Sequence, residues 1–141
     1  MYNGITPIIA HPERNSSLRR DHSPLLDWIE FGCLSQLTGQ SCTGAFGNSI
    51  QKFSFELIAN NLVHFIASDA HRAEGRNPNL KDAFITINTN FGENVAQILF
   101  QRNPEKLING LDIESLTLNT KNYLNLYTTT KNKKPWFKIF N

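Results

Sequence analysis

Residues 8–14 have the sequence Ile8-Ile9-Ala10-His11-Pro12-Glu13-Arg14, and residues 66–71 have the sequence Ile66-Ala67-Ser68-Asp69-Ala70-His71. In both, a short apolar run ends in residues that can bind metals or take part in catalysis. Such runs are typical of buried strands, and α/β proteins place ligands and catalytic groups at the carboxyl ends of their strands. We therefore expect these two stretches to bring their polar residues to one common site.

The polar residues of the two stretches form a possible ligand set for a divalent metal. Imidazoles from His11 and His71 with the carboxylate of Asp69 suit zinc, manganese or iron better than a thiolate-held structural ion. Arg14 and Arg76 follow the two stretches, and guanidinium groups bind phosphate oxygens bidentately. Alternatively, the histidines are hydrogen-bonded structural residues and the arginines are surface charges. The occurrence of both motifs at predicted strand ends favours the metal site.

Three segments resemble, in the same order, motifs of the bacterial manganese-dependent protein-tyrosine phosphatases. These enzymes regulate capsule and exopolysaccharide synthesis and belong to the polymerase-and-histidinol-phosphatase (PHP) superfamily. The matching segments are residues 4–15, 31–47 and 64–78, which contain His-Pro-Glu-Arg, Gln-Leu-Thr-Gly-Gln-Ser and Ser-Asp-Ala-His respectively. The resemblance fades along the C-terminal third.

The resemblance implies a role for each matching residue. His11, Asp69 and His71 correspond to metal ligands, with Mn²⁺ as the expected cofactor and Zn²⁺, Fe²⁺ or Co²⁺ as other candidates. Arg14 and Arg76 correspond to the catalytic residues that hold the substrate phosphate. The substrate implied is a phosphotyrosine protein, in particular a bacterial tyrosine kinase.

The resemblance also implies an incomplete domain. The family fold is a distorted (β/α)₇ barrel of the α/β class, and residues 1–118 resemble only its C-terminal part, with a polar and then basic and aromatic tail over 119–141. The family draws further ligands from a His-x-His motif, whereas this chain has four histidines and no such pair. We therefore expect a fragment that needs a missing N-terminal half or a homo-oligomer.

Apolar periodicity and boundary residues predict alternating strands and helices in a parallel α/β arrangement. The predicted elements are a buried strand at 6–10, a helix at 18–31 with Pro24 in its first turn and Gly32 at its end, a strand at 33–37, a Gly-, Ser- and Thr-rich loop at 38–49, a helix at 50–60, a strand at 62–67, helices at 80–88 and 93–101, and a short helix at 105–109 that follows Pro104.

We expect mainly structural roles for the remaining candidate residues. His22 lies in a charged stretch and is expected to be solvated, and for His64 a place in the site depends on the register of its strand. Ser41 is expected to be a loop hydroxyl that bonds backbone, or at most reaches a phosphate. Cys33 and Cys42 lack Cys-x-x-Cys spacing and are expected to be reduced thiols.

Charge and hydropathy exclude several classes of protein. A net charge of +2 with scattered basic residues does not indicate nucleic-acid binding. No apolar stretch is long enough to span a bilayer, and no secretory signal is visible, so we expect a soluble, cytoplasmic protein. Basic and aromatic residues of the tail could dock on an anionic membrane, although packing of the tail on the domain or a neighbouring subunit is the interpretation we favour.

Two alternative functions stay open. A phosphoesterase of the histidinol-phosphate type would share the metal site but accept a small substrate. A non-catalytic truncated remnant would keep part of the fold without turnover.

Overall fold

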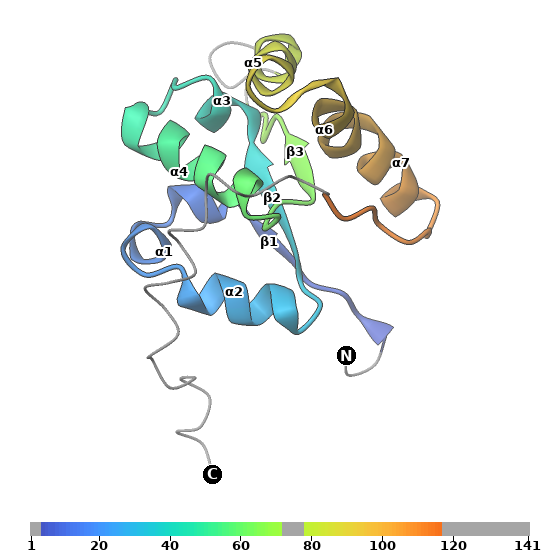
Figure 1. Ribbon diagram of the computed structural model, residues 1–141. Helices are drawn as coiled ribbons and strands as arrows, with labels where there is room; N and C mark the ends of the chain where they lie inside the picture. The colour runs from blue at the N-terminus through green and yellow to red at the C-terminus, as the bar shows by residue number, and fades with distance from the viewer. Residues whose placement is uncertain (1–3, 72–77, 117–141) are drawn as a thin grey trace.

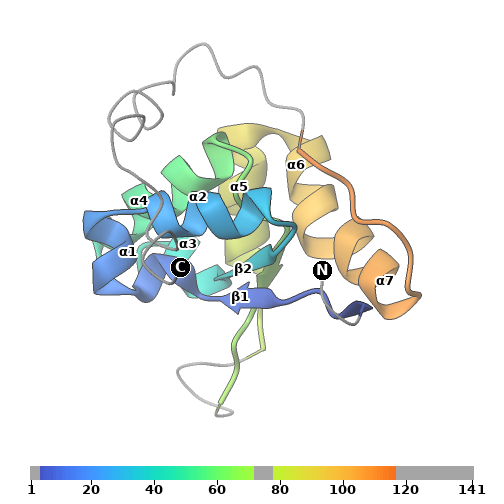
Figure 2. The same ribbon diagram turned by 90° about the horizontal axis from the view of Figure 1, so that it is seen from below.

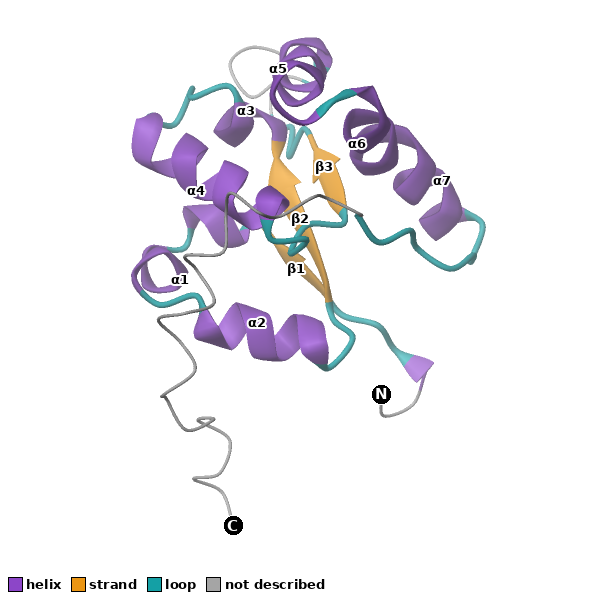
Figure 3. Cartoon of the chain, viewed as in Figure 1, coloured by secondary structure: helices purple, strands orange, loops and turns teal. Residues whose placement is uncertain are grey.

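The computed structural model describes residues 4–71 and 78–116, which form an α/β fold around a small parallel sheet. The strands are β1 (Ile8–Ala10), β2 (Leu34–Thr38) and β3 (Phe65–Ala67), in that spatial order. Figure 1 shows helices surrounding this sheet, and Figure 3 shows the same arrangement by element type. The predicted parallel α/β pattern is confirmed, whereas the complete (β/α)₇ barrel stays a prediction. Arg76 and the tail 119–141 lie outside the described residues.

The strands are aligned in register, so their carboxyl ends reach the same edge of the sheet. Ile9 pairs with Ser35 across the first two strands, and Leu37 pairs with Ile66 across the second and third. Parallel pairing requires a crossover between successive strands, and helices provide it here. The residues that follow β1 and β3 are therefore held at the same edge of the sheet, on either side of the end of β2.

The segment between β1 and β2 was predicted to contain one helix, at 18–31, but the structure contains two. It contains the 3₁₀ turn η2 (Pro12–Arg14) and two helices, α1 (Ser16–Arg20) and α2 (Ser23–Glu30). The break occurs because the Asp21 carboxylate accepts hydrogen bonds from the backbone N–H and hydroxyl of Ser23, which begins the second helix. Pro24 lies in the first turn of α2, as predicted.

The segment between β2 and β3 contains two helices. The predicted loop at 38–49 was wrong in part, because it includes α3 (Gly39–Cys42). The longer α4 (Asn48–Ala59) confirms the predicted helix at 50–60 and begins slightly earlier. Beyond β3, the chain forms α5 (Lys81–Phe91), α6 (Glu93–Gln97), the π-helix η3 (Ile98–Arg102) and α7 (Asn103–Ile108).

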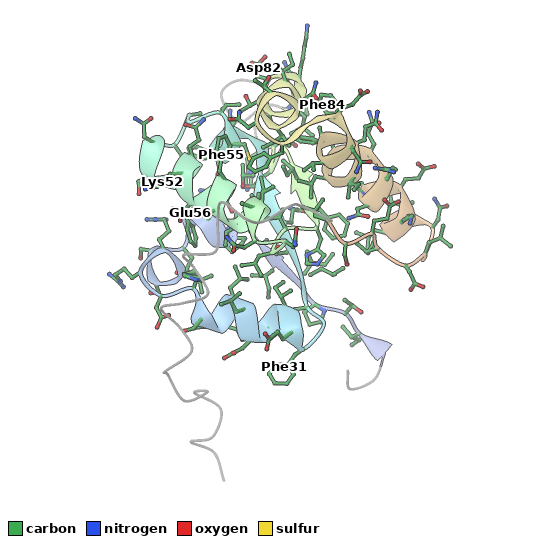
Figure 4. The ribbon with its side chains drawn as sticks, in the orientation of Figure 1. Phe31, Lys52, Phe55, Glu56, Asp82 and Phe84 are labelled. Atoms are coloured by element: carbon green, nitrogen blue, oxygen red, sulfur yellow. The ribbon has the colours of Figure 1, made fainter. Side chains whose placement is uncertain are left out.

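Apolar side chains between the sheet and its helices form one core. The fully buried members include Leu25, Leu37, Leu57, Ile87 and Leu99. At 25 cal/mol per Å² or so, such burial is the main stabilising contribution to a domain of this size. Phe31, by contrast, is 62% exposed and points away from the body at the end of α2 (Figure 4).

Strand β1 lies at the edge of the sheet and is not buried as predicted. Ile8 is 38% exposed, and Ala10 is exposed as well. In Figure 2 the strand runs across the lower part of the helical body. The reason is that β1 has a described partner, β2, on one side alone, so apolar composition did not guarantee burial.

Within the described residues, none of the helices combines the length and the apolar character needed to cross a membrane.

Candidate functional site

The site is built at the carboxyl edge of the sheet by the residues that directly follow β1 and β3. His11 follows β1, and its backbone N–H donates to the carbonyl of Gln36 on β2 at 2.8 Å. His11 has φ of 39° and Asp69 has φ of 50°, both in the left-handed region that residues other than glycine rarely adopt. Backbone conformations of this kind cluster at functional sites, where the surrounding structure holds them in place.

An ion pair joins the two motifs across the sheet edge. Nη1 of Arg14 lies 3.0 Å from Oδ2 of Asp69, with both side chains partly exposed. The Arg14 guanidinium also lies over the ring of Phe46, 5.0 Å from its centroid. The prediction that the two stretches meet at one site is therefore realised through Arg14 and Asp69.

The predicted metal ligands are only partly assembled. His71 Nδ1 lies 2.7 Å from the backbone oxygen of Asp69 and 3.8 Å from its Oδ1, and the imidazole is 59% exposed. Within residues 4–71 and 78–116, no group of three or more His, Cys, Asp or Glu side chains is placed to hold a metal ion. The carboxylate and imidazole of the neighbouring Asp69 and His71 have the donor chemistry that Mn²⁺ and Zn²⁺ accept. The assignment of His11, Asp69 and His71 as ligands stays a prediction, and so does the role of Arg76.

Glu13 is a residue of the site region to which sequence reasoning gave no role. Its side chain is fully buried, and Oε1 accepts hydrogen bonds from the Thr38 backbone N–H at 3.0 Å and the Ser41 hydroxyl at 2.6 Å. The prediction that Ser41 bonds backbone was therefore wrong, because its hydroxyl meets a buried carboxylate. The sequence carries little signal for this arrangement, since a glutamate after a strand is usually exposed.

The buried thiol of Cys42 lies in the same region as Glu13. Burial, followed by the charge of Glu13, raises the pKa of Cys42 far above its ordinary value, so the thiol stays protonated. Cys33 is half-buried and also free, as expected for reduced thiols. A protonated thiol is a poor nucleophile, which agrees with chemistry that depends on water instead.

Two histidines have structural surroundings. His22 was predicted to be solvated, but it is 9% exposed and packs near Phe53 with 6.4 Å between ring centroids. The charged neighbours in the sequence wrongly predicted exposure of His22, because the turn between α1 and α2 places its ring near Phe53. His64 lies at the amino end of β3, where its Nδ1 accepts a hydrogen bond from the Ser35 backbone N–H at 3.0 Å. Burial lowers the pKa of His64 to about 4.

A pocket of about 240 Å³ opens between α3 and the first turn of α5. Its polar lining includes Gln40, Asn79 and Asp82, and Figure 4 shows Asp82 at that end of α5. Gly39 forms part of the wall, directly after β2. The pocket therefore adjoins the carboxyl edge of the sheet, and Asp82 supplies a carboxylate to its described lining.

The parallel sheet and the Arg14–Asp69 pair at its carboxyl edge define an α/β protein with a polar site at its strand ends. Residues 1–109 match the family model for capsular polysaccharide synthesis proteins CpsB/CapC. The chain therefore belongs to the CpsB/CapC family, and the resemblance drawn from the motifs is confirmed.

Individual relatives agree with this assignment. The chain is 40% identical over 105 residues to the tyrosine-protein phosphatase YwqE of Bacillus subtilis, covering 74% of this chain and 41% of that protein. It is 33% identical over 110 residues to the tyrosine-protein phosphatase CpsB of Streptococcus pneumoniae, covering 74% of this chain and 45% of that protein. The chain thus spans less than half the length of these relatives.

A solved structure shows the same fold. The match is to crystal structures of YwqE from Bacillus subtilis and CpsB from Streptococcus pneumoniae, described as metal-dependent tyrosine phosphatases, with a TM-score of 0.76 and 38% identity. The match covers 80% of this chain and 45% of the solved chain.

Proposed function

We propose that this chain supplies the C-terminal part of a metal-dependent protein-tyrosine phosphatase. The substrate in this proposal is a phosphotyrosine protein, specifically a tyrosine kinase of capsule or exopolysaccharide synthesis, and the reaction takes place in the cytoplasm. The observation that carries the proposal is the ion pair between Arg14 and Asp69, which brings a guanidinium and a carboxylate from separate motifs to one sheet edge. In the proposal the guanidinium binds phosphate and the carboxylate binds the metal.

The residues of this edge fit the groups that the reaction requires. His11, Asp69 and His71 would hold the metal, with Mn²⁺ as the proposed ion, and their nitrogen and oxygen donors suit it. When bound, the metal supplies Lewis-acid chemistry that activates water and stabilises charge on the phosphate.

Arg14 has a defined task in this proposal. Its guanidinium is held between the Asp69 carboxylate and the ring of Phe46, so its direction is set before a substrate arrives. A phosphate ester that enters beside it would gain two parallel N–H···O contacts, and the charge that develops on the phosphate oxygens would be neutralised. Arg76 is proposed to hold the same phosphate from the opposite motif.

The chain is proposed to act together with further structure. Because it spans less than half of its relatives, the remaining metal ligands of the site would come from an N-terminal half or from a second copy of the chain. Among the described strands β1 pairs on one side alone, so its other edge offers backbone groups to which a further strand can be added.

The test is phosphatase turnover on a phosphotyrosine peptide with added Mn²⁺. The chain is assayed alone and mixed with the N-terminal half of YwqE, with that half alone as a control. We expect turnover in the mixture that neither part shows by itself, and no turnover on a matched phosphoserine peptide. Turnover on histidinol phosphate in place of the peptide would replace the proposal with a small-molecule phosphoesterase. A mixture that is folded and associated but inactive on both substrates would indicate a non-catalytic remnant.

A further inference from the structure

We propose that Glu13 is the positioning residue of this site, acting through its carboxylate to hold the turn that presents Arg14 to Asp69. The inference rests on the proposed function for its catalytic meaning, but the geometry that it describes can be tested separately. The Glu13 carboxylate binds Thr38 and Ser41, so it acts on Arg14 through the backbone of the turn that Glu13 and Arg14 share.

The two hydrogen bonds of Glu13 tie the turn after β1 to the segment after β2. Thr38 is the last residue of β2 and Ser41 belongs to α3, and both donate to the same carboxylate oxygen. The side chain of Glu13 therefore anchors η2 to the carboxyl end of the neighbouring strand.

The backbone of the same turn is held from the other side. Nη1 of Arg19 in α1 donates to the carbonyl oxygen of Glu13 at 2.9 Å. Both the side chain and the backbone of Glu13 are thus fixed. His11 and Arg14 flank this anchored residue within the same four-residue stretch, so the position of Glu13 limits where both can lie.

The burial of Glu13 is not what stability alone would favour. Its second oxygen, Oε2, is buried without a hydrogen-bond partner among the described residues. A buried polar atom without a hydrogen bond costs free energy, and exceptions of this kind call for a specific reason. In the proposal that reason is positional, because Glu13 lies in the short turn between the left-handed His11 and Arg14.

The test measures the Arg14 guanidinium by NMR, through the N–H signals that slow rotation in an ion pair makes visible. These signals are compared in the wild type, Glu13→Gln, Glu13→Ala and Ser41→Ala, with Asp69→Asn to identify the ion-paired state. Glutamine keeps an acceptor oxygen for both hydrogen bonds, so Glu13→Gln should retain the Arg14 signals. Glu13→Ala should lose them, and Ser41→Ala should weaken them.

Ser35→Ala is the matched control, because it also removes a buried hydroxyl that donates a hydrogen bond, but at the opposite end of β2. If Glu13→Ala does not fold, Ser41→Ala carries the test against Ser35→Ala. Unchanged Arg14 signals in Ser41→Ala, or equal losses in Ser41→Ala and Ser35→Ala, would overturn the proposal. Loss of the signals in a folded Glu13→Gln would also overturn it, since acceptor geometry would then be insufficient.

This measurement needs neither metal nor substrate. If the phosphatase assay fails and the Arg14 signals still depend on Glu13, the proposed function fails and the positioning role stands. If turnover is observed and the signals do not depend on Glu13, the positioning role fails alone.

Discussion

Arg14 and Asp69 lie 55 positions apart in the sequence, and their side chains form an ion pair with 3.0 Å between Nη1 and Oδ2. The pair connects the turn after β1 to the end of β3. Because the two strands are separated by β2, this contact spans the carboxyl edge of the sheet. It places the phosphate-binding candidate of one motif against the metal-binding candidate of the other.

Replacing Arg14 should affect turnover far more than stability. Arg14→Met should lower turnover of the complemented enzyme about a hundredfold, as expected when a group that stabilises transition-state charge is removed. The unfolding free energy should change by about 1 kcal/mol or less, because the ion pair is partly exposed. Steady-state kinetics and urea unfolding measure the two effects. Arg14→Lys keeps the charge but loses the planar guanidinium, so its turnover should lie between those of the wild type and Arg14→Met. Full turnover in Arg14→Met would contradict the assignment of Arg14 to phosphate binding.

Asn103 should be essential for the packing of the C-terminal helices. Its side chain is fully buried, and Nδ2 donates to the backbone oxygens of His64 at 3.0 Å and Glu114 at 2.9 Å, while Oδ1 accepts from the Glu114 N–H. Asn103→Asp would place a carboxylate against two carbonyls and should cost more than about 3 kcal/mol of unfolding free energy. Urea unfolding measures this cost. Asn109→Asp, at an exposed position just after the other end of α7, is the control and should change stability by about 0.5 kcal/mol or less.

Gly39 should not tolerate a side chain. A Cβ atom there would lie 2.7 Å from Cδ2 of Leu80 and 3.2 Å from Cβ of Ala83, so the Leu80 side chain would have to turn away and the first turn of α5 to shift slightly. Gly39→Ala should lower the unfolding free energy by about 1–3 kcal/mol through overpacking. Thermal unfolding of Gly39→Ala, Leu80→Ala and the double variant forms a mutant cycle. The double variant should be more stable than the sum of the single changes predicts; strict additivity would show that the contact is not the cause.

His64 should make stability depend on pH in the acidic range. Its folded-state pKa of about 4 lies below the ordinary value of 6.5, because burial disfavours the charged form. The unfolded chain therefore takes up the proton first, and stability is lost as the pH falls from 6.5 towards 4. Urea unfolding at pH 7 and pH 4.5 should show a smaller loss in His64→Gln than in the wild type. Equal losses would mean that His64 is not the group responsible.

The order and direction of the strands could be predicted from the sequence because each strand is a short apolar run bounded by helix signals. Pro24 and Pro104 correctly indicated first turns, since proline lacks the N–H that a first turn leaves unused. The burial of β1 could not be predicted, because Ile8 and Ile9 describe a strand but not what covers it. The split between α1 and α2 depends on the Asp21 side chain, whose competing hydrogen bonds are not visible in apolar periodicity.

At the site, the sequence could predict that the two motifs meet but not how. The motifs predicted that Arg14 and Asp69 lie at strand ends on one edge of the sheet, and the structure joins them directly past the end of β2. The buried role of Glu13 was missed because its partners, Thr38 and Ser41, are more than twenty residues away along the chain. His22 was misjudged for a related reason, since local charge says little about which side of a helix turn meets the core.

The most direct test of the proposed phosphatase centre is the Mn²⁺-dependent turnover of a phosphotyrosine peptide by Asp69→Asn in the mixture with the N-terminal half of YwqE. Asparagine keeps the size of the side chain and removes its charge, and Asp112→Asn at an exposed position is the matched control. We predict that Asp69→Asn is folded, associates with the N-terminal half and has no measurable turnover. The turnover of Asp112→Asn should equal that of the wild type. Wild-type turnover by Asp69→Asn would contradict the proposed phosphatase centre, because the reaction would then not depend on the carboxylate that joins the two motifs.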